Sequence, residues 1–245
     1  MNSHFQSPEG PSGVLLIDKA PDMTSHDVVA IARRALNTKK IGHCGTLDPM
    51  ATGLLMLVIG RATKIQDLLM SEDKEYEGTI TLGATTSTQD RQGEILETRE
   101  VTEFPADAIE AAFARFDGNF EQIPPMVSAI KKDGVPLYKL ARKGEVVERK
   151  PRPVYVTEHA ITRVESPQID FTVKCSKGFY VRTYAHDIGE ALGCGAHLSA
   201  LRRTRSGKFT LGPRALPAMD LKTLPREEIL KAMFTLSEIS LMRGA

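Results

Sequence analysis

The sequence predicts an α+β fold with a mixed, largely antiparallel central sheet flanked by helices. The 245 residues are 41% hydrophobic and 26% charged, which is ordinary for a globular chain able to bury its own core. Strand-like apolar runs and amphipathic helical stretches mix along the chain without the regular βαβ alternation of a parallel sheet. We find no internal repeat, heptad pattern or low-complexity tract that would favour another architecture.

In the N-terminal half, residues 1–12 are rich in Gly, Ser and Pro and are expected to form a flexible tail. The runs GVLLI at 13–17 and LLMLVI at 54–59 predict buried strands. Between them, Thr24 or Ser25 can cap a helix over 26–36. The alternating stretch 75–82 predicts a half-exposed strand, and Pro105 opens a helix that extends to about 116.

In the C-terminal half, residues 136–143 predict a short basic helix, and 154–164 and 169–175 predict a pair of strands. Residues 181–192 predict a helix that ends at Gly193. Two further strands are expected at 196–201 and 208–211, and one final helix at 226–236.

The formal net charge is only +1, but the charge is unevenly distributed. Residues 131–152 and 199–214 each carry a net charge of +5, whereas residues 71–121 carry −9. The two basic segments could contact phosphates of RNA or DNA. The alternative is that both segments are solvated surface, and charge alone does not decide between the two.

Several classes of protein are disfavoured by what the sequence lacks. It has no GxxxxGK[ST], GxGxxG, HExxH or GxSxG motif, so nucleotide-dependent and zinc enzymes are not expected. The three cysteines are widely spaced and the six histidines are scattered, so we predict no disulfide scaffold and no metal site. No signal-peptide pattern or run of 18 apolar residues is present, and the predicted location is the cytoplasm, with no membrane contact.

The most unusual stretch is HCGTLDPMATG at residues 43–53, directly before the predicted strand at 54–59. Pro49 disfavours helical geometry at Asp48, and the neighbouring Leu47, Met50 and Ala51 would exclude water from its carboxylate. An aspartate in such a setting is a candidate nucleophile or base. The alternative is an Asp-Pro turn residue that bonds its own backbone.

This stretch belongs to an ordered set of motifs. GTLDPMATG is followed by KEYEGTITLG, TSTQDRQGEI, IPPMVSAIKKDGVPLYKLARKGE, GFYVRTYAHDIGEALG and HLSALRRTRSGKF. In this order and at these distances, the set resembles the TruB family of tRNA pseudouridine-55 synthases over residues 13–209. The resemblance implies the pseudouridine synthase fold with a thumb-like RNA-binding insertion at 131–152, and a catalytic domain at 13–211. It also implies isomerisation of uridine 55 in the T loop of tRNA after base flipping.

The resemblance implies a role for individual residues. Asp48 matches the family's nucleophile and Arg182 its arginine partner, although alone Arg182 could be an ordinary surface residue of a helix. Tyr76 matches the tyrosine that lies against the uracil, the alternative being a tyrosine on a core or strand face. His43 matches the histidine that holds the flipped nucleotide region, and Tyr180 and Leu201 match residues that line the uracil pocket. Other family motifs contain Lys19, Lys64 and Asp90, for which surface charge is an equal explanation.

The C-terminal residues 212–245 are expected to form a short stub ending in one helix, with no complete RNA-binding PUA domain. The expected partner is the T arm of tRNA, and we predict a monomer without an obligatory protein partner. Two alternatives remain: a guided pseudouridylase of the H/ACA ribonucleoprotein type, and a tRNA-binding folding chaperone whose catalysis is incidental.

Overall fold

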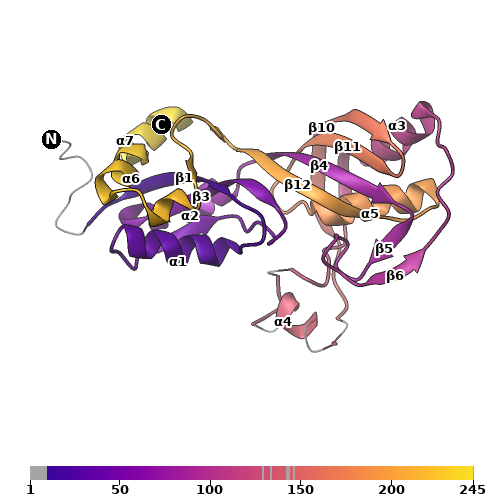
Figure 1. The fold of residues 1–245 in the computed structure, drawn as a ribbon, viewed down its shortest axis with the longest axis horizontal. Helices are drawn as coiled ribbons and strands as arrows, with labels where there is room; N and C mark the ends of the chain where they lie inside the picture. The colour runs from indigo at the N-terminus through magenta and orange to yellow at the C-terminus, as the bar shows by residue number, and fades with distance from the viewer. Residues whose placement is uncertain (1–9, 129, 133, 142–143, 146, 245) are drawn as a thin grey trace. The chain divides into compact units, whose positions relative to one another are not determined.

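The computed structural model describes residues 10–128, 130–132, 134–141, 144–145 and 147–244. Contacts within the chain divide it into two compact units. The first unit contains the chain as far as Tyr76 and again from Arg202 onward, and the second unit extends from Glu77 to Leu201. Strands β4 (Lys74–Leu82) and β12 (Ala196–Ser206) therefore each contribute residues to both units (Figure 1).

Strand β3 (Thr52–Ile59) is at the centre of the first unit. It pairs antiparallel with β1 (Gly13–Lys19) and with β2 (Ile41–Cys44), and its start pairs in parallel with β12. Two short strands complete the pairing: β14 (Leu216–Pro217) is parallel to β1, and β13 (Phe209–Thr210) is antiparallel to β12. Every residue of β3 after Thr52 is buried, which explains its continuous apolar run.

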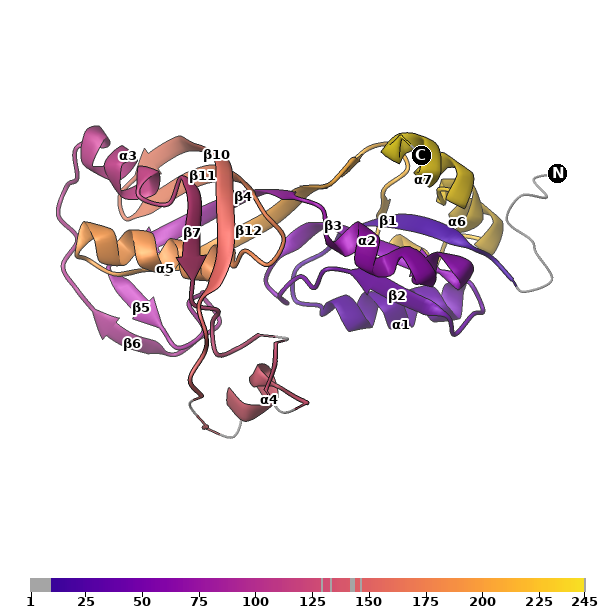
Figure 2. The same ribbon diagram turned by 180° about the vertical axis from the view of Figure 1, so that it is seen from behind.

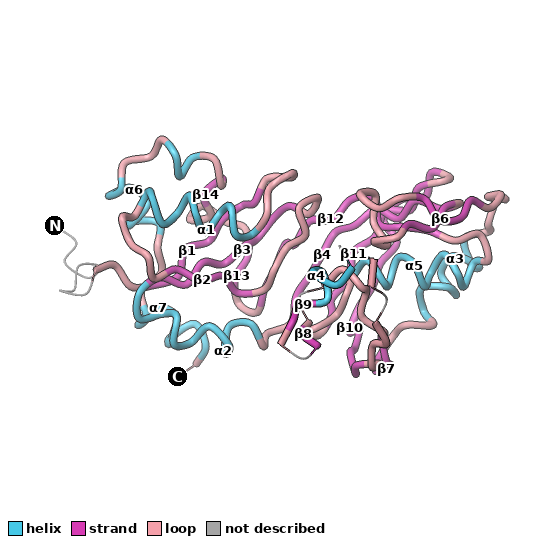
Figure 3. Tube along the Cα trace, turned by 90° about the horizontal axis from the view of Figure 1, so that it is seen from below, coloured by secondary structure: helices cyan, strands magenta, loops and turns pink. Residues whose placement is uncertain are grey.

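Helices cover the strands of the first unit on two sides (Figure 3). Helix α1 (Ser25–Ala35) lies on one side and buries Val28, Val29 and Ala32. On the other side, Leu69 of α2 (Gln66–Met70) and Ile239 of α7 (Leu236–Arg243) join a core cluster with residues of β1, β2 and β3. The remaining short helices of this unit are η2 (Gly60–Ile65), η3 (Asp220–Lys222) and α6 (Arg226–Ala232).

The second unit contains the strand order β12-β4-β11-β10-β7, in which β7 (Gly118–Gln122) is at the edge (Figure 2). The long strand β10 (Arg152–Glu165) pairs antiparallel with both β7 and β11 (Gln168–Cys175). Separate two-stranded sheets are formed by β5 (Ala84–Thr86) with β6 (Ile95–Thr98), and by β8 (Lys131–Lys132) with β9 (Val135–Pro136).

An aromatic cluster holds the helices of the second unit against its sheet. Helix α3 (Ala106–Ala114) contributes Phe113, β11 contributes Phe171, and α5 (Val181–Leu192) contributes Tyr184. The ring centroids of these three residues lie 5.7–5.8 Å apart in edge-to-face contacts. This packing fixes α5, the helix that carries Arg182 in its first turn.

The α+β class is confirmed, and so are the strands expected at 13–17, 54–59, 75–82, 154–164 and 169–175. Thr24 caps α1 through a capping box with Asp27, and α5 ends at Gly193 in the left-handed conformation. The short helix expected at 136–143 is α4 (Leu137–Ala141), and positions 142 and 143 lie outside the described residues. The strand expected to stop at 201 continues to Ser206 as β12.

The expectation of one final helix at 226–236 is wrong. Helix α6 ends after Ala232, and a second helix, α7, begins after Thr235, which forms a capping box with Glu238. Between them Phe234 exchanges two backbone hydrogen bonds with Val14 of β1, of 2.9 and 2.7 Å. These bonds require extended backbone, which a continuous helix cannot supply.

Residues 212–244 pack into the first unit rather than standing apart from it, since Ile239 and Phe234 contribute to the cluster that contains Val14 and Met56. At the other end, the hydroxyl oxygen of Ser12 accepts a hydrogen bond from the backbone of Arg61 at 3.1 Å. The boundaries of the catalytic domain, expected after residue 12 and at residue 211, stay predictions.

Candidate active site

Asp48 lies in the loop that joins β2 to β3 in the first unit. Gly45 and Gly53, on either side of it, have φ angles of +84° and +93°, a region that favours glycine. A Cβ on Gly53 would lie 2.3 Å from the carbonyl oxygen of Arg203, so only glycine allows β3 and β12 to approach here. The Asp48 backbone forms a turn in which the Ala51 N–H donates to its carbonyl at 3.0 Å.

The expected apolar surroundings of Asp48 are confirmed. Leu47, Met50 and Ala51 are at most 3% exposed, whereas Asp48 itself is half-buried. Asp48 therefore lies in a backbone turn at the border of an apolar layer.

Two buried polar side chains hold this loop against the start of α1. The Ser25 hydroxyl accepts from the Leu47 N–H at 2.9 Å and lies 3.2 Å from the Leu47 carbonyl, to which it donates. Lys19, which is 0% exposed, donates from Nζ to the carbonyl oxygens of Pro49, Ala20 and Met23 at 3.1, 2.9 and 2.7 Å. The surface-charge interpretation of Lys19 is wrong, because this ammonium is part of the interior.

A third buried side chain, Arg203 of β12, holds the ends of the loop. Its Nε donates to the Leu54 carbonyl at 2.7 Å and its Nη2 to the Gly45 carbonyl at 3.1 Å. Arg203 is 1% exposed and 158 residues from Gly45, so sequence reasoning did not connect the two. The signal available was only that a basic residue occupies a strand that alternates between buried and exposed positions.

Lys19 and Asp48 interact electrostatically. Burial lowers the pKa of Lys19 to about 8, while the charges of Asp48, Asp22 and Asp27 act in the opposite direction. An aspartate held in a rigid, partly dry loop beside buried cations can act as a nucleophile.

His43 precedes this loop on β2, and its backbone carbonyl accepts from the Gln66 side chain at 3.1 Å. Burial lowers the pKa of His43 to about 4, with smaller contributions from His26 and Arg203, and the Gly45 backbone acts in the opposite direction. His43 is therefore neutral at physiological pH and is suited to positioning rather than to proton uptake. Tyr76 is half-buried on β4, at the end of the first segment of this unit.

In the second unit, Arg182 is buried at the start of α5, with 3% exposure, so the surface-residue alternative is wrong. Its Nη1 donates to the Thr88 carbonyl at 2.9 Å and its Nη2 to the Val127 carbonyl at 2.8 Å. Its Nε lies 3.7 Å from Oδ2 of Asp90, which is also buried. Asp90 in turn accepts from the Thr88 hydroxyl at 2.6 Å, so these contacts orient the guanidinium.

Tyr180 directly precedes α5 and is held by the buried side chain of Gln122. The Gln122 amide donates to the Tyr180 carbonyl at 3.1 Å and accepts from its N–H at 2.8 Å. Leu201 is 9% exposed on β12, at the end of the second unit. The structure thus groups Asp48 and His43 with Lys19 and Arg203 in one unit, and Arg182 and Tyr180 with Asp90 in the other.

The charge of the segment 199–214 is largely used inside the first unit. Arg202 forms a two-point ion pair with Asp18, Arg205 lies 3.2 Å from Glu75, and Arg214 bonds Glu238 at 2.8 Å. Arg203 is buried. Lys208, which is exposed, is the remaining basic residue of the segment, and no ion pair is described for it. Four of the five basic residues of this segment are thus paired or buried within the first unit.

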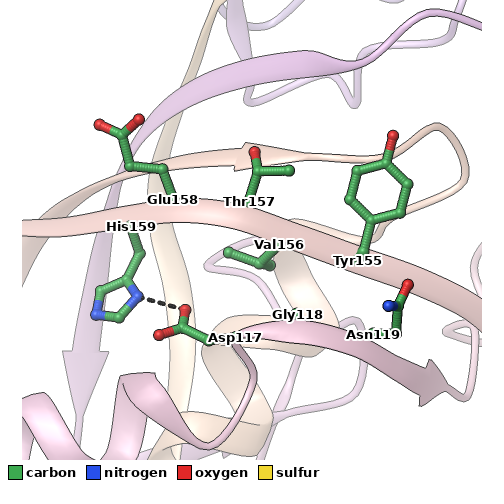
Figure 4. A pocket seen from close by; sticks show the side chains of 8 residues that line it. All are labelled: Asp117, Gly118, Asn119, Tyr155, Val156, Thr157, Glu158 and His159. Carbon is green, nitrogen blue, oxygen red and sulfur yellow. Dashed lines mark hydrogen bonds and ion pairs between the residues drawn. The ribbon is translucent and has the colours of Figure 1, made fainter.

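A pocket of the second unit lies along β7 and β10 (Figure 4). His159 bonds Asp117 there at 2.7 Å, and none of the predicted site residues lines it. Among the described residues no three His, Cys, Asp or Glu side chains are arranged to hold a metal ion. Within the same part of the chain, no helix is long and apolar enough to cross a membrane.

Comparison with known proteins identifies relatives over most of the chain. A protein named tRNA pseudouridine synthase B from Opitutus terrae is 58% identical over 221 residues, which are 90% of this chain and 91% of the relative. Proteins of the same name from Syntrophotalea carbinolica and Pseudomonas paraeruginosa are 51% and 50% identical over 81% and 88% of this chain, which spans 65% and 69% of their lengths.

The fold is similar to solved structures. A chain in the crystal structure of a Cbf5-Nop10-Gar1 complex has a TM-score of 0.73 and 30% identity, covering 94% of this chain and 62% of its own. A chain of the archaeal box H/ACA sRNP Nop10-Cbf5 complex has a TM-score of 0.69 and 29% identity, covering 96% and 61%.

Two family models cover the region that contains the site. Residues 33–181 match the TruB family pseudouridylate synthase N-terminal domain, and residues 182–235 match the tRNA pseudouridylate synthase B C-terminal domain. The Asp48 loop lies in the first match, Lys19 and Ser25 precede that match, and the second match begins at Arg182 and includes Arg203. This chain belongs to the TruB family of pseudouridylate synthases.

Proposed function

We propose that this chain isomerises uridine 55 in the T loop of tRNAs to pseudouridine, acting in the cytoplasm as a monomer without cofactor or protein partner. The observation that carries the proposal is the Asp48 loop, an aspartate turn clamped by Lys19, Ser25 and Arg203 in an apolar layer. The names of relatives at 50–58% identity support tRNA as the substrate.

The reaction breaks the bond between ribose C1′ and uracil N1 and forms a bond between C1′ and C5. N1 gains a proton and C5 loses one, so the reaction needs no oxidant, reductant or added group. In our proposal Asp48 is the nucleophile that holds the intermediate while the base turns. Arg182 is its partner, and a guanidinium oriented by Asp90 and two carbonyls is suited to hold a carboxylate.

The target base must leave its stack before it can react. Tyr76 is proposed to stack on the flipped uracil, a contact that contributes about 1–3 kcal/mol per base, and to help remove the C5 proton. In the same proposal Tyr180 and Leu201 line the pocket that receives the uracil, and His43 holds the region of the flipped nucleotide. The neutral state of His43 fits a hydrogen-bonding role rather than that of a base.

Phosphate contacts are proposed to come from the insertion at 131–152 and from exposed lysines and arginines of the first unit. Lys39 and Lys40 precede β2, Arg61 and Lys64 lie in η2, and all four are exposed. The Gly60 N–H donates to the Lys40 carbonyl at 2.9 Å, which brings the two segments together. Charge reversal at Lys40 and Arg61 would weaken tRNA binding and flatten its salt dependence by about 0.7–0.9 per lost phosphate contact.

The test incubates the purified chain with an unmodified tRNA transcript and maps pseudouridine by position. The proposal predicts pseudouridine at position 55, none in a transcript with cytidine at 55, and none with Asp48→Asn protein. Modification at another position, or turnover by Asp48→Asn, would overturn the assignment.

The same assay separates the two alternatives. The guided alternative rests on the similarity to chains of Cbf5 complexes, and a guided enzyme would modify the transcript only when a guide RNA and partner proteins are added. A folding chaperone would speed tRNA folding equally well as wild type and as Asp48→Asn. Full turnover by the chain alone, lost with Asp48, excludes both as the main function.

A further inference from the structure

A second histidine lies against His43. His26 is exposed in the first turn of α1, and its ring centroid is 5.3 Å from that of His43, with the two ring planes at 81°. This is an edge-to-face contact, the arrangement in which the positive edge of one ring meets the face of the other. It connects α1 to β2 within the first unit, 17 residues apart in the chain.

The turn that carries His26 is itself firmly held. Thr24 and Asp27 form a capping box, with hydrogen bonds of 2.8 and 3.1 Å between side chains and backbone. Ser25, the residue before His26, bonds both the N–H and the carbonyl of Leu47, next to Asp48. The first turn of α1 therefore contacts the Asp48 loop through Ser25 and the neighbouring strand through His26.

The surroundings of His43 favour a fixed, uncharged ring. The titratable groups that act on it are His26 from α1 and Arg203 from β12, and both lower the pKa of His43. The pKa of His43 is about 4, mainly because the ring is buried. The Gly45 backbone also acts on the imidazole, and the ring of His26, which lies against it from α1, opposes rotation of the His43 ring about its bond to Cβ.

We propose that His26 is a positioning residue whose ring holds the His43 imidazole in the orientation that meets the target nucleotide. This inference rests on the proposed function, because the nucleotide-holding role of His43 belongs to it. His26 acts through His43 and has no direct contact with the reacting atoms.

The experiment compares His26→Ala with His26→Phe, which keeps an aromatic edge without the imidazole nitrogens. An aromatic contact of this type predicts that His26→Ala lowers kcat/KM by about 3- to 10-fold. His26→Phe should restore most of the loss. A melting temperature close to that of wild type would show that α1 is intact, since neither variant touches the capping box.

A double-mutant cycle with His43→Ala tests whether His26 acts through His43. If it does, His26→Ala has no further effect in the His43→Ala background. Additive losses would mean that His26 contacts RNA independently and would overturn the proposal. An unchanged kcat/KM for His26→Ala, or no rescue by phenylalanine, would overturn it as well.

A readout without RNA separates this proposal from the proposed function. Imidazole resonances of the RNA-free protein report the pKa of His43, which should rise in His26→Ala because the ring that lies against it and the electrostatic effect of that ring are both removed. In His26→Phe it should stay closer to wild type. If the wild-type protein lacks activity yet the pKa of His43 shifts as expected, the proposed function is wrong and the contact between His26 and His43 is right. If the wild-type protein is active and the pKa of His43 does not shift, the inference about His26 fails alone.

Discussion

Replacing Lys19 by methionine is expected to destabilise the protein by about 1–3 kcal/mol at pH 7. The substitution removes three hydrogen bonds, of 2.7–3.1 Å, from the carbonyls of the half-buried residues Ala20, Met23 and Pro49. Such losses cost about 1.5–2 kcal/mol each, or about 5 kcal/mol together. The opposing term is relief from burying a charge, about 3 kcal/mol, since the pKa of Lys19 falls from 10.5 to about 8.

The pH dependence of this difference is the more specific signature. Because the folded-state pKa of Lys19 lies below its unfolded value, the unfolded chain binds more protons between about pH 8 and 10.5. Stability contributed by this group therefore rises with pH through that window. The methionine variant lacks that rise, so its deficit relative to wild type should grow by about 1–3 kcal/mol.

Urea denaturation at several pH values measures the effect, and at neutral pH the expected shift in melting temperature is about 3–10 °C. Lys64→Met is the matched control, an exposed lysine of the same unit for which neither a loss of stability nor a pH signature is expected. A deficit that stays constant from pH 7 to 10.5 would refute the reasoning, because Lys19 would then not be a buried titrating group.

Further substitutions test the supports of the site. Ser25→Ala leaves the buried Leu47 N–H without its acceptor and should cost about 1–3 kcal/mol in urea denaturation, with a lower single-turnover rate; unchanged values would contradict the clamp. Asp48→Asn should abolish turnover but spare tRNA affinity in filter binding, since dispersed phosphate contacts carry binding. Arg182→Ala should lower the free energy of unfolding by about 3–5 kcal/mol, because the buried Asp90 loses its ion-pair partner. Arg182→Lys should keep most of the stability but lose activity. Equal urea midpoints for wild type and Arg182→Ala would exclude the pairing of Arg182 with Asp90.

The features predicted from the sequence are those encoded by nearby residues. The apolar run of β3, the Thr24 cap of α1 and the glycine end of α5 are local patterns, and all were confirmed. The Asp48 loop was also recognisable, because its glycines and proline dictate backbone geometry within nine residues. In each case the residues that determine the local structure lie close together in the sequence.

The features that could not be predicted depend on partners far away in the chain. Arg203 reaches Gly45 across 158 residues, and the charge of Arg202 is paired with Asp18, 184 residues away. A count of charges over the segment 199–214 treats both arginines as available, although one is buried and the other is paired. The break between α6 and α7 has the same origin, since Phe234 is extended only because Val14 pairs with it.

The supports of Asp48 also suggest how a carboxylate can be both ionised and reactive. A nearby positive charge favours the ionised form, but a carboxylate saturated by hydrogen bonds is a weaker nucleophile. Lys19 avoids this conflict, because its ammonium has three N–H donors and all three are bound to backbone carbonyls. Lys19 therefore acts on Asp48 through its electrostatic field, while its hydrogen bonds hold the loop in place. An arginine there could direct remaining donors at the carboxylate, which explains why a compact buried lysine suits this position.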